Sequence, residues 1–249
     1  MLADQRQHQI RAELARHGSV VASALALRFG VSEDTIRRDL RELSLGGVCH
    51  RVYGGAVAPY GGPFLHRVAQ APAQKAALAM GALPLIRPHQ TLFIDAGTTN
   101  LAIARALLPG MPLTVATNSL AIATVLAAQP QITLILLGGV FDAETGACTG
   151  AATVQAIQKI SADLVFLGSC GIDITRGATA FDPAEAEVKR AMVAASACVA
   201  VAATADKLGT HAPYRVAPPT AISHLITQHS APADLLAGFR AVGTTLHLA

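Results

Sequence analysis

The sequence has few charged residues and no hydrophobic run of membrane-spanning length. Asp, Glu, Lys and Arg make up 14% of its 249 residues, whereas 52% are hydrophobic. This composition favours a packed core and argues against intrinsic disorder. The longest apolar stretch, residues 192–205, is too short to span a bilayer and contains Ser196 and Thr204. Because the N-terminal residues also lack the apolar core of a signal peptide, we expect a cytoplasmic protein with no membrane contact.

Cysteine and histidine are too scattered to predict a metal site. The four cysteines, Cys49, Cys148, Cys170 and Cys198, show no CxxC spacing, and no two of the nine histidines are spaced as HxxxH. Such spacings are typical of zinc ligands and redox pairs. We therefore expect buried or half-buried free thiols, no metal site and no cofactor.

Lysine is absent from the first 60 residues, where arginine supplies all the Lys or Arg charge. The net charge of +3 and the pI of about 8.8 are only weakly basic and do not by themselves establish nucleic-acid binding. The placement is more informative, because arginine binds phosphate or guanine through two parallel hydrogen bonds and lysine does not. The N-terminal arginines are Arg6, Arg11, Arg16, Arg28, Arg37, Arg38, Arg41 and Arg51.

A break rich in proline and glycine divides the chain in two. Regular structure is disfavoured between residues 56 and 64 by Pro59, Gly61, Gly62 and Pro63. We predict an N-terminal domain at 1–57, a linker at 58–72 and a larger domain at 73–249.

The N-terminal domain is predicted to hold three helices and a hairpin. Apolar residues recur at helical spacing in 5–17 and in 20–29, and a third helix follows from the N-cap Ser32 to about Leu45. Residues 48–57 alternate around a Gly-Gly turn, which favours a short hairpin, or wing. A short helix, a tight turn and an amphipathic helix are typical of a helix-turn-helix that places its second helix in the major groove.

The third helix carries the residues expected to contact DNA. Its apolar stripe of Ile36, Leu40 and Leu43 leaves the polar side chains on other faces. Arg37 and Arg38 point about 100° apart, so that one could read a base while its neighbour holds phosphate. The candidate DNA-binding residues are Ser32, Thr35, Arg37, Arg38 and Arg41, with Arg51 and Tyr53 on the wing. The alternative is an ordinary solvated arginine face. Asp39 and Glu42 would make that face less positive, and Asp39 could instead pair with a nearby arginine.

The larger domain alternates apolar runs of strand length with helical stretches. The strands are expected at 91–95, 113–117, 132–137, 163–168, 197–203 and 222–227, and the helices at 100–108, 119–128, 151–160 and 183–195. Unbroken apolar strands separated by helices indicate a mostly parallel sheet covered on both faces, an α/β domain.

A strand, a Gly-Thr-Thr turn and a helix follow one another in residues 94–107, IDAGTTNLAIARAL. The turn leaves backbone N–H groups at Gly97, Thr98 and Thr99 without helical partners, beside two hydroxyl groups. Such a helix N-terminus binds anions, and phosphate suits it best. A threonine N-cap on a plain turn explains the same residues without a ligand.

The motifs together resemble one family along nearly the whole chain. VSEDTIRRDLREL at 31–43, followed by RVYGGAV at 51–57, is similar to the signature of the DeoR family of bacterial transcription regulators. ATNSL at 116–120, LGG at 137–139, ADLVFLGSCGID at 162–173, EAEVKRAM at 185–192 and ADKLG at 205–209 look like successive blocks of the DeoR sensor domain. Two departures are Tyr53, where the family usually has histidine, and Gln228, where it often has aspartate.

The resemblance implies a fold and a set of roles. It implies a winged helix-turn-helix followed by a sensor domain related to ribose-5-phosphate isomerase and CoA transferases, with a sugar-phosphate pocket at the strand ends. Gly97, Thr98 and Thr99 would hold the phosphate, while the remaining effector-binding residues would be Asp95, Asn118, Gly171, Asp173, Glu185, Lys189 and Lys207. A surface salt bridge between Glu185 and Lys189 and a surface turn at 206–207 are the alternatives for those residues.

Three functions fit the sequence to different degrees. The first is a repressor of a sugar-catabolism operon that binds double-stranded operator DNA as a homodimer or homotetramer and is released by a phosphorylated sugar. The second is a sugar-phosphate isomerase-like enzyme, which has no use for a DNA-reading element and which fold alone does not establish. The third is a winged helix used for protein contact, against which the row of Thr35, Arg37, Arg38 and Arg41 speaks. We expect a regulator that is not an enzyme.

Overall fold

The structure is a computed structural model that describes residues 2–17, 19–45, 48–52, 54–57 and 63–249. The chain divides into two compact units, Met1–Arg67 and Val68–Ala249. Within the described ranges, no helix is both long enough and apolar enough to cross a membrane.

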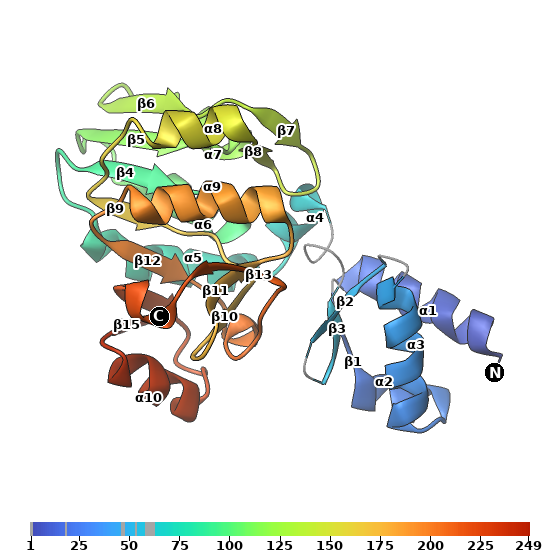
Figure 1. Cartoon of the computed structure of the whole chain (residues 1–249). Helices are drawn as coiled ribbons and strands as arrows, with labels where there is room; N and C mark the ends of the chain where they lie inside the picture. The colour runs from blue at the N-terminus through green and yellow to red at the C-terminus, as the bar shows by residue number, and fades with distance from the viewer. Residues whose placement is uncertain (1, 18, 46–47, 53, 58–62) are drawn as a thin grey trace. The chain divides into compact units, whose positions relative to one another are not determined.

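The N-terminal unit combines three helices with a three-stranded antiparallel sheet of order β1-β3-β2 (Figure 1). Its elements are α1 (Ala3–His17), β1 (Ser19–Val21), α2 (Ala22–Phe29), α3 (Glu33–Leu45), β2 (His50–Val52) and β3 (Gly55–Val57). The predicted wing hairpin is β2–β3. Helix α2 begins two residues later than predicted, because Val20 and Val21 extend a strand that pairs with Ala56 and Gly55. β-Branched side chains suit that pairing.

The helices of this unit enclose a small apolar core. Ile10 and Leu14 of α1 and Leu25 of α2 are buried against the stripe on α3, whose Ile36, Leu40 and Leu43 are at most 1% exposed. The predicted buried stripe of the third helix is therefore confirmed. The opposite face of α3 remains in solvent.

The larger unit is built on a seven-stranded, wholly parallel sheet of order β15-β14-β12-β9-β4-β5-β6. The strands are β4 (Thr91–Ile94), β5 (Leu113–Thr117), β6 (Ile132–Leu136), β9 (Leu164–Phe166), β12 (Val199–Ala202), β14 (His224–Thr227) and β15 (Thr245–Leu248). All six predicted strands are present. The seventh, β15, went unpredicted because Thr245 and His247 interrupt its apolar pattern at the edge of the sheet.

Helices cover both faces of this sheet, as predicted. They are α5 (Pro72–Ala82), α6 (Thr98–Ala106), α7 (Leu120–Leu126), α8 (Ala151–Ile157), α9 (Pro183–Ala194) and α10 (Ala233–Ala241), with short helices η2 (Leu83–Leu85), η3 (Ala205–Lys207) and η4 (Pro219–Ala221). Figure 1 shows α8 and α9 in front of the strands and α6 behind them. On the α9 face, Val188 and Met192 pack in one buried cluster with Phe93, Val201 and Phe239.

Two small antiparallel sheets and one further helix complete the fold. β10 (Gly171–Asp173), β11 (Gly177–Ala180) and β13 (Tyr214–Ala217) form one sheet, and β7 (Val140–Asp142) with β8 (Ala147–Thr149) forms the other. Helix α4 (Phe64–Ala69) lies within the stretch 58–72 that the sequence assigned to a linker. Residues 58–62 of that stretch fall outside the described ranges. All four cysteines are free thiols.

The order of the strands reverses direction at β4. The chain adds β5 and β6 on one side of β4, and then places β9, β12, β14 and β15 on the other. In open parallel sheets, ligands bind outside the carboxyl ends of the strands at such a switch point. The segments that follow β4 and β9 are therefore the first place to search for a ligand site.

Candidate functional sites

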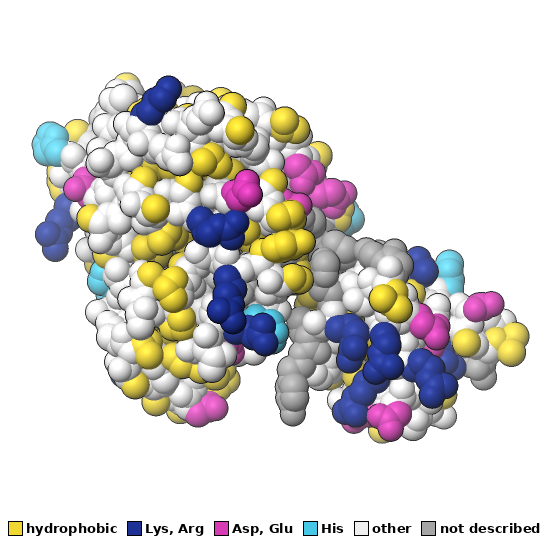
Figure 2. Space-filling view, viewed as in Figure 1, with side chains coloured by type: hydrophobic (Ala, Val, Ile, Leu, Met, Phe, Trp, Pro, Cys, Tyr) yellow, Lys and Arg dark blue, Asp and Glu magenta, His cyan; other side chains and the backbone are white. Residues whose placement is uncertain are grey.

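The exposed face of α3 lies opposite the buried stripe. Arg37, Arg38 and Arg41 are exposed, and Lys and Arg side chains gather on the N-terminal unit in the space-filling view (Figure 2). The predicted N-cap is confirmed: the backbone N–H of Thr35 donates to Ser32 Oγ at 3.2 Å, and the two hydroxyl oxygens are 2.9 Å apart. Ser32 and Thr35 thus stabilise the helix end that α3 presents to solvent.

Arg37 is held by the acidic first turn of its own helix. Its Nη2 lies 2.9 Å from Glu33 Oε2, and its Nη1 lies 3.2 Å from Asp34 Oδ1. These pairs are exposed and therefore weak. The guanidinium groups of Arg38 and Arg41 have no ion-pair partner within the described ranges. Arg51 is exposed on β2, whereas Tyr53 lies outside the described residues.

Asp39 does not reduce the positive charge of the exposed face, because it is buried. Both carboxylate oxygens accept from the guanidinium of Arg6, with Nε to Oδ2 and Nη2 to Oδ1 at 2.9 Å. The hydrogen bond from Arg6 to Asp39 raises the pKa of Arg6, outweighing the effect of burial. Of the two interpretations of Asp39, pairing with an arginine is the one observed. The sequence did not identify Arg6 as the partner, since the two residues are 33 positions apart.

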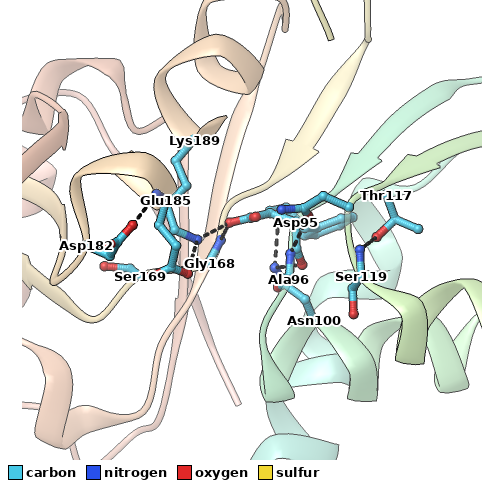
Figure 3. Close-up of polar contacts among 12 residues, drawn as sticks. Asp95, Ala96, Asn100, Thr117, Ser119, Gly168, Ser169, Asp182, Glu185 and Lys189 are labelled. Carbon is cyan, nitrogen blue, oxygen red and sulfur yellow. Dashed lines mark hydrogen bonds and ion pairs between the residues drawn. The ribbon is translucent and has the colours of Figure 1, made fainter. Parts of the chain in front are cut away.

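At the switch point of the larger sheet, a buried carboxylate joins β4 to β9 and α9 (Figure 3). Asp95 Oδ2, directly after β4, accepts the backbone N–H of Gly168 at 2.8 Å and Lys189 Nζ at 2.5 Å. Asp95 Oδ1 is buried and has no hydrogen-bond partner among the described residues. A buried acceptor left in this state costs free energy unless a partner satisfies it. The described residues therefore leave a buried acceptor without a donor at this switch point.

Lys189 and Glu185 form part of this buried centre. Their side chains are 4% and 9% exposed, and Lys189 Nζ lies 3.8 Å from Glu185 Oε1. Burial alone would lower the pKa of Lys189, but the charges of Asp95 and Glu185 outweigh it and raise that pKa. The i, i+4 pair therefore exists, but it belongs to a buried cluster with Asp95 and is no surface salt bridge.

Two asparagines hold the loop that follows β4. Asn118 Oδ1 accepts the backbone N–H of Ala96 at 3.0 Å, and its Nδ2 donates to the carbonyl of Cys148 at 3.2 Å. Asn100 Nδ2 lies 2.9 Å from the carbonyl oxygens of both Asp95 and Phe166. The resemblance implied Asn118 as an effector-binding residue, whereas Asn100 was missed. Its only sequence signal is a polar amide in the first turn of a helix, immediately after the Gly-Thr-Thr turn.

The Gly-Thr-Thr turn for which anion binding was predicted lies at the start of α6. Gly97 has φ 155° and ψ 151°, a conformation that side-chain-bearing residues rarely adopt, and α6 begins at Thr98. The first N–H groups of an α-helix have no partner inside the helix. Gly168 brings β9 close to the same turn, because a Cβ there would lie 2.5 Å from the carbonyl oxygen of Ala96. The turn, Asp95 and Gly168 therefore lie close together at the carboxyl ends of β4 and β9.

Lys207 approaches this centre from the far side of β9. Its Nζ donates to the carbonyl of Ser169 at 3.0 Å, while the neighbouring Asp206 is exposed. Gln228, the departure noted in the sequence, uses its Oε1 to accept the N–H of Ala205 at 2.9 Å. That bond caps η3, the short helix that carries Lys207. Gln228 therefore has a structural role at this position.

Gly171 and Asp173 lie on β10, beyond Ser169. Ser169 Oγ donates to the carbonyl of Gly171 at 2.5 Å. The Oδ1 atom of Asp173 accepts from Thr175 N, Thr175 Oγ1 and Arg176 N, which closes the turn between β10 and β11. Burial raises the pKa of Asp173, but these hydrogen bonds outweigh burial, and the pKa is lowered. Within the described ranges, no hydrogen bond or ion pair joins Asp173 to the Asp95–Lys189 pair.

Comparison with known proteins agrees with this division. Residues 6–60 match the model of the DeoR-like helix-turn-helix domain, and residues 70–229 match that of the DeoR C terminal sensor domain. The glycerol-3-phosphate regulon repressor of Escherichia coli K12 is 32% identical over 245 residues, covering 92% of this chain and 97% of that protein. The transcriptional regulator IolR of Bacillus subtilis is 30% identical over 217 residues, covering 84% and 86%.

Likeness to solved structures is weaker. Ribose 5-phosphate isomerase A from Neisseria gonorrhoeae matches 57% of this chain and 56% of its own, at 15% identity and a TM-score of 0.41. That level of likeness says nothing about activity, whereas the family models cover most of the chain. The protein therefore belongs to the DeoR family of transcriptional regulators.

Proposed function

We propose that this protein represses a sugar-catabolism operon in the bacterial cytoplasm and leaves its operator when a phosphorylated sugar binds the larger domain. The observation that carries the sensor half is the buried Asp95, whose Oδ1 has no hydrogen-bond partner among the described residues, at the switch point beside the N-terminus of α6. Relatives named as repressors of the glycerol-3-phosphate regulon and as IolR support the regulatory role.

The two ends of the effector are recognised by different chemistry. The phosphate binds the N–H groups and hydroxyls of Thr98 and Thr99 after Gly97, where the helix dipole favours an anion. A sugar hydroxyl donates to Asp95 Oδ1. Lys207 adds positive charge, while Asn118 and the Glu185–Lys189 pair hold the loop and Asp95 in place. Gly171 and Asp173 line the outer end of the site through the β10–β11 hairpin.

The DNA-reading surface is the exposed face of α3 together with the wing. Ser32, Thr35, Arg37 and Arg38 reach base edges or phosphates, and Arg41, Arg51 and Tyr53 hold the flanking backbone. Two copies of the chain place two such surfaces on successive half-sites, so we propose a homodimer or a homotetramer. The functional domains are 1–57 and 73–249, with 58–72 between them.

Release from the operator requires that the effector favour the DNA-free arrangement. A sugar phosphate that bound both arrangements equally would shift nothing, however tight its binding. Moving the protein from mostly bound to mostly released takes a difference of about 10⁴-fold in effector affinity between the two arrangements. The effector site therefore couples to DNA through a conformational equilibrium and needs no turnover.

The isomerase-like alternative is disfavoured by the state of Lys189. An acid–base catalyst works best when its pKa lies near the working pH. The charges of Asp95 and Glu185 raise the pKa of Lys189 against the effect of burial, which makes this amine a poor general base, and its Nζ donates to Asp95 Oδ2. Turnover of ribose 5-phosphate would contradict this assignment.

A gel shift tests both halves of the proposal. The probe is the DNA upstream of the protein's own gene, titrated at several salt concentrations and against a panel of phosphorylated sugars. We expect binding that weakens steeply with salt and that one sugar phosphate reverses. Binding that no phosphosugar reverses would contradict the sensor half, and absence of binding to this probe at every salt concentration would contradict the DNA-reading half.

A further inference from the structure

Asp34 is an acidic side chain at the centre of the face that α3 presents to solvent. The buried residues of α3 are Ile36, Asp39, Leu40 and Leu43. At about 100° per residue, Asp34 lies opposite that stripe, and its side chain is 88% exposed. Arg38 and Arg41 follow four and seven residues later, on the same face.

The position of Asp34 along the helix is as informative as its direction. It is the second residue of α3, directly after Glu33. In helix-turn-helix proteins, the N-terminal residues of the recognition helix contact base edges. If α3 enters the major groove as proposed above, Asp34 therefore approaches the bases and not only the backbone.

A carboxylate in that place has few favourable partners. It accepts hydrogen bonds only, and the phosphates on both sides of the groove repel it. The hydrogen-bond donors on the major-groove base edges are cytosine N4–H and adenine N6–H. Adenine places its N7 acceptor beside N6, which suits the amide of asparagine or glutamine, whereas cytosine presents N4–H to an acid.

Arg37 lies beside this carboxylate and contacts it weakly in the absence of DNA. Its Nη1 lies 3.2 Å from Asp34 Oδ1, while its Nη2 binds Glu33 Oε2 at 2.9 Å. Asp34 Oδ2 accepts no hydrogen bond within the described ranges. An arginine beside an acid on one helix face also offers complementary groups to the two bases of a G·C pair, since arginine binds guanine O6 and N7.

Comparison with Glu33 distinguishes two roles for Asp34, contact with a base and stabilisation of the helix end. Both acids lie in the first turn, where negative charge stabilises the helix dipole, and both contact Arg37. Glu33, however, is one residue earlier and therefore about 100° away, toward the edge of the buried stripe, and is half as exposed at 45%. Stabilisation of the helix end would account for an acid at either position. It does not require Asp34, the more exposed of the two, to point outward between two arginines.

We infer that Asp34 is a specificity-determining residue that accepts a hydrogen bond from cytosine N4 in the major groove, and that it makes the operator contain a C·G pair at that position of each half-site. This rests on the DNA-reading surface proposed above. Without that surface, Asp34 has no base to contact.

The test is an in vitro selection with the full-length chain from duplexes that carry a randomised 20-bp core. The selected duplex is then measured by fluorescence anisotropy, one base pair changed at a time. We expect one C·G pair per half-site at which T·A, which replaces the N4 donor by an O4 acceptor, weakens binding about tenfold or more. Asp34→Asn is expected to prefer A·T at that pair, and Asp34→Ala to accept all four pairs there within about twofold.

Glu33→Gln is the matched control, because it removes one negative charge from the same turn and from the same arginine. It is expected to keep the preference for C·G at that pair. Asp4→Asn, an exposed first-turn acid of α1, controls for overall charge. Circular dichroism of each variant verifies that α3 is intact.

Two results would contradict the inference in different ways. If Asp34→Ala selects the same sequence as the wild type and binds every duplex more tightly by one common factor, Asp34 acts through charge alone and the inference is wrong. If the wild-type chain enriches no sequence from the library, the proposed DNA-reading function fails and the inference falls with it.

Discussion

The buried pair of Arg6 and Asp39 is a residue contact that joins α1 to α3. It ties the first helix to the recognition helix through two parallel hydrogen bonds inside an otherwise apolar core. Such a fork-to-carboxylate arrangement restricts both distance and angle. We therefore regard it as the contact that sets the orientation of α3 on α1.

Asp39→Ala is expected to lower the free energy of unfolding of the N-terminal domain by about 3–5 kcal/mol, because it leaves the guanidinium of Arg6 buried without its partner. Chemical denaturation followed by circular dichroism measures the change. Glu42→Ala on the same helix, where an exposed hydrogen bond from Gln7 is lost, is the control and should cost far less. Equal losses in the two variants would contradict a special role for the buried pair.

Arg38→Ala should weaken operator binding by about 1–3 kcal/mol and leave stability unchanged. Arg38 is exposed in the middle of the outward face of α3, and loss of a guanine contact costs about that much. Anisotropy titration with the duplex obtained by selection measures the affinity. Arg105→Ala, in the last turn of α6, is the charge-matched control. Unchanged affinity in Arg38→Ala would show that α3 is not the recognition helix.

At the scale of single elements, the N-terminus of α6 carries the sensor proposal. The double change Thr98→Val and Thr99→Val removes two hydroxyls but keeps the side-chain shape of this turn. We expect DNA binding within about twofold of the wild type and loss of release by any sugar phosphate, because the phosphate loses its hydroxyl ligands. The gel shift with the phosphosugar panel is the measurement.

Thr124→Val on α7 is the control for that double variant. Among the described residues, its hydroxyl bonds to the carbonyl of Leu120 in its own helix, so normal release is expected. If the Thr98 and Thr99 double variant is also released normally, the phosphate does not bind at the start of α6 as proposed.

The edge strand β15 and its neighbour β14 carry a histidine pair that is expected to make stability depend on pH. His224 Nδ1 and His247 Nε2 are 3.1 Å apart. Burial, and then the charge of His247, lowers the pKa of His224. The unfolded chain therefore binds the proton more readily than the folded one, so stability is lost as pH falls through about 6.5, the unfolded value.

His224→Gln should flatten that part of the profile. The wild-type thermal midpoint is expected to fall between pH 7.5 and 5.5, and the variant to show a smaller fall over the same range. Calorimetry of both proteins at matched ionic strength measures the difference. His66→Gln, on α4, is the control and should follow the wild type. Parallel profiles for wild type and His224→Gln would show that folding does not lower the pKa of His224.

On the scale of the whole molecule, the two compact units predict separable functions. A fragment from Phe64 to Ala249 keeps α4 and the complete parallel sheet. We expect it to fold alone, to be stabilised by the effector that releases the full chain, and to bind no DNA. Thermal melting with and without that sugar phosphate, together with a gel shift, measures both properties. A fragment that does not fold would contradict independent domains.

Several features of the protein followed from its sequence because they are local. Ser32 caps α3, the apolar stripe of that helix is buried, and the Gly-Thr-Thr turn begins α6, each as predicted. Six strands were located from unbroken apolar runs. Capping, helical periodicity and strand burial depend on residues that are close together in the chain, so the amino-acid sequence is enough to predict them.

Tertiary structure decided which distant residues meet. Asp39 meets Arg6 across 33 positions, and Asp95 meets Lys189 across 94. The resemblance to a family implied that Asp95 and Lys189 belong to one site. It did not predict that Asp95 Oδ1 has no hydrogen-bond partner among the described residues, nor the bonds from Asn100. These contacts depend on the order of the strands, with β9 beside β4 and the reversal at that point. Apolar strands of similar composition do not specify their neighbours, because that choice is made by packing of the helices over both faces of the finished sheet.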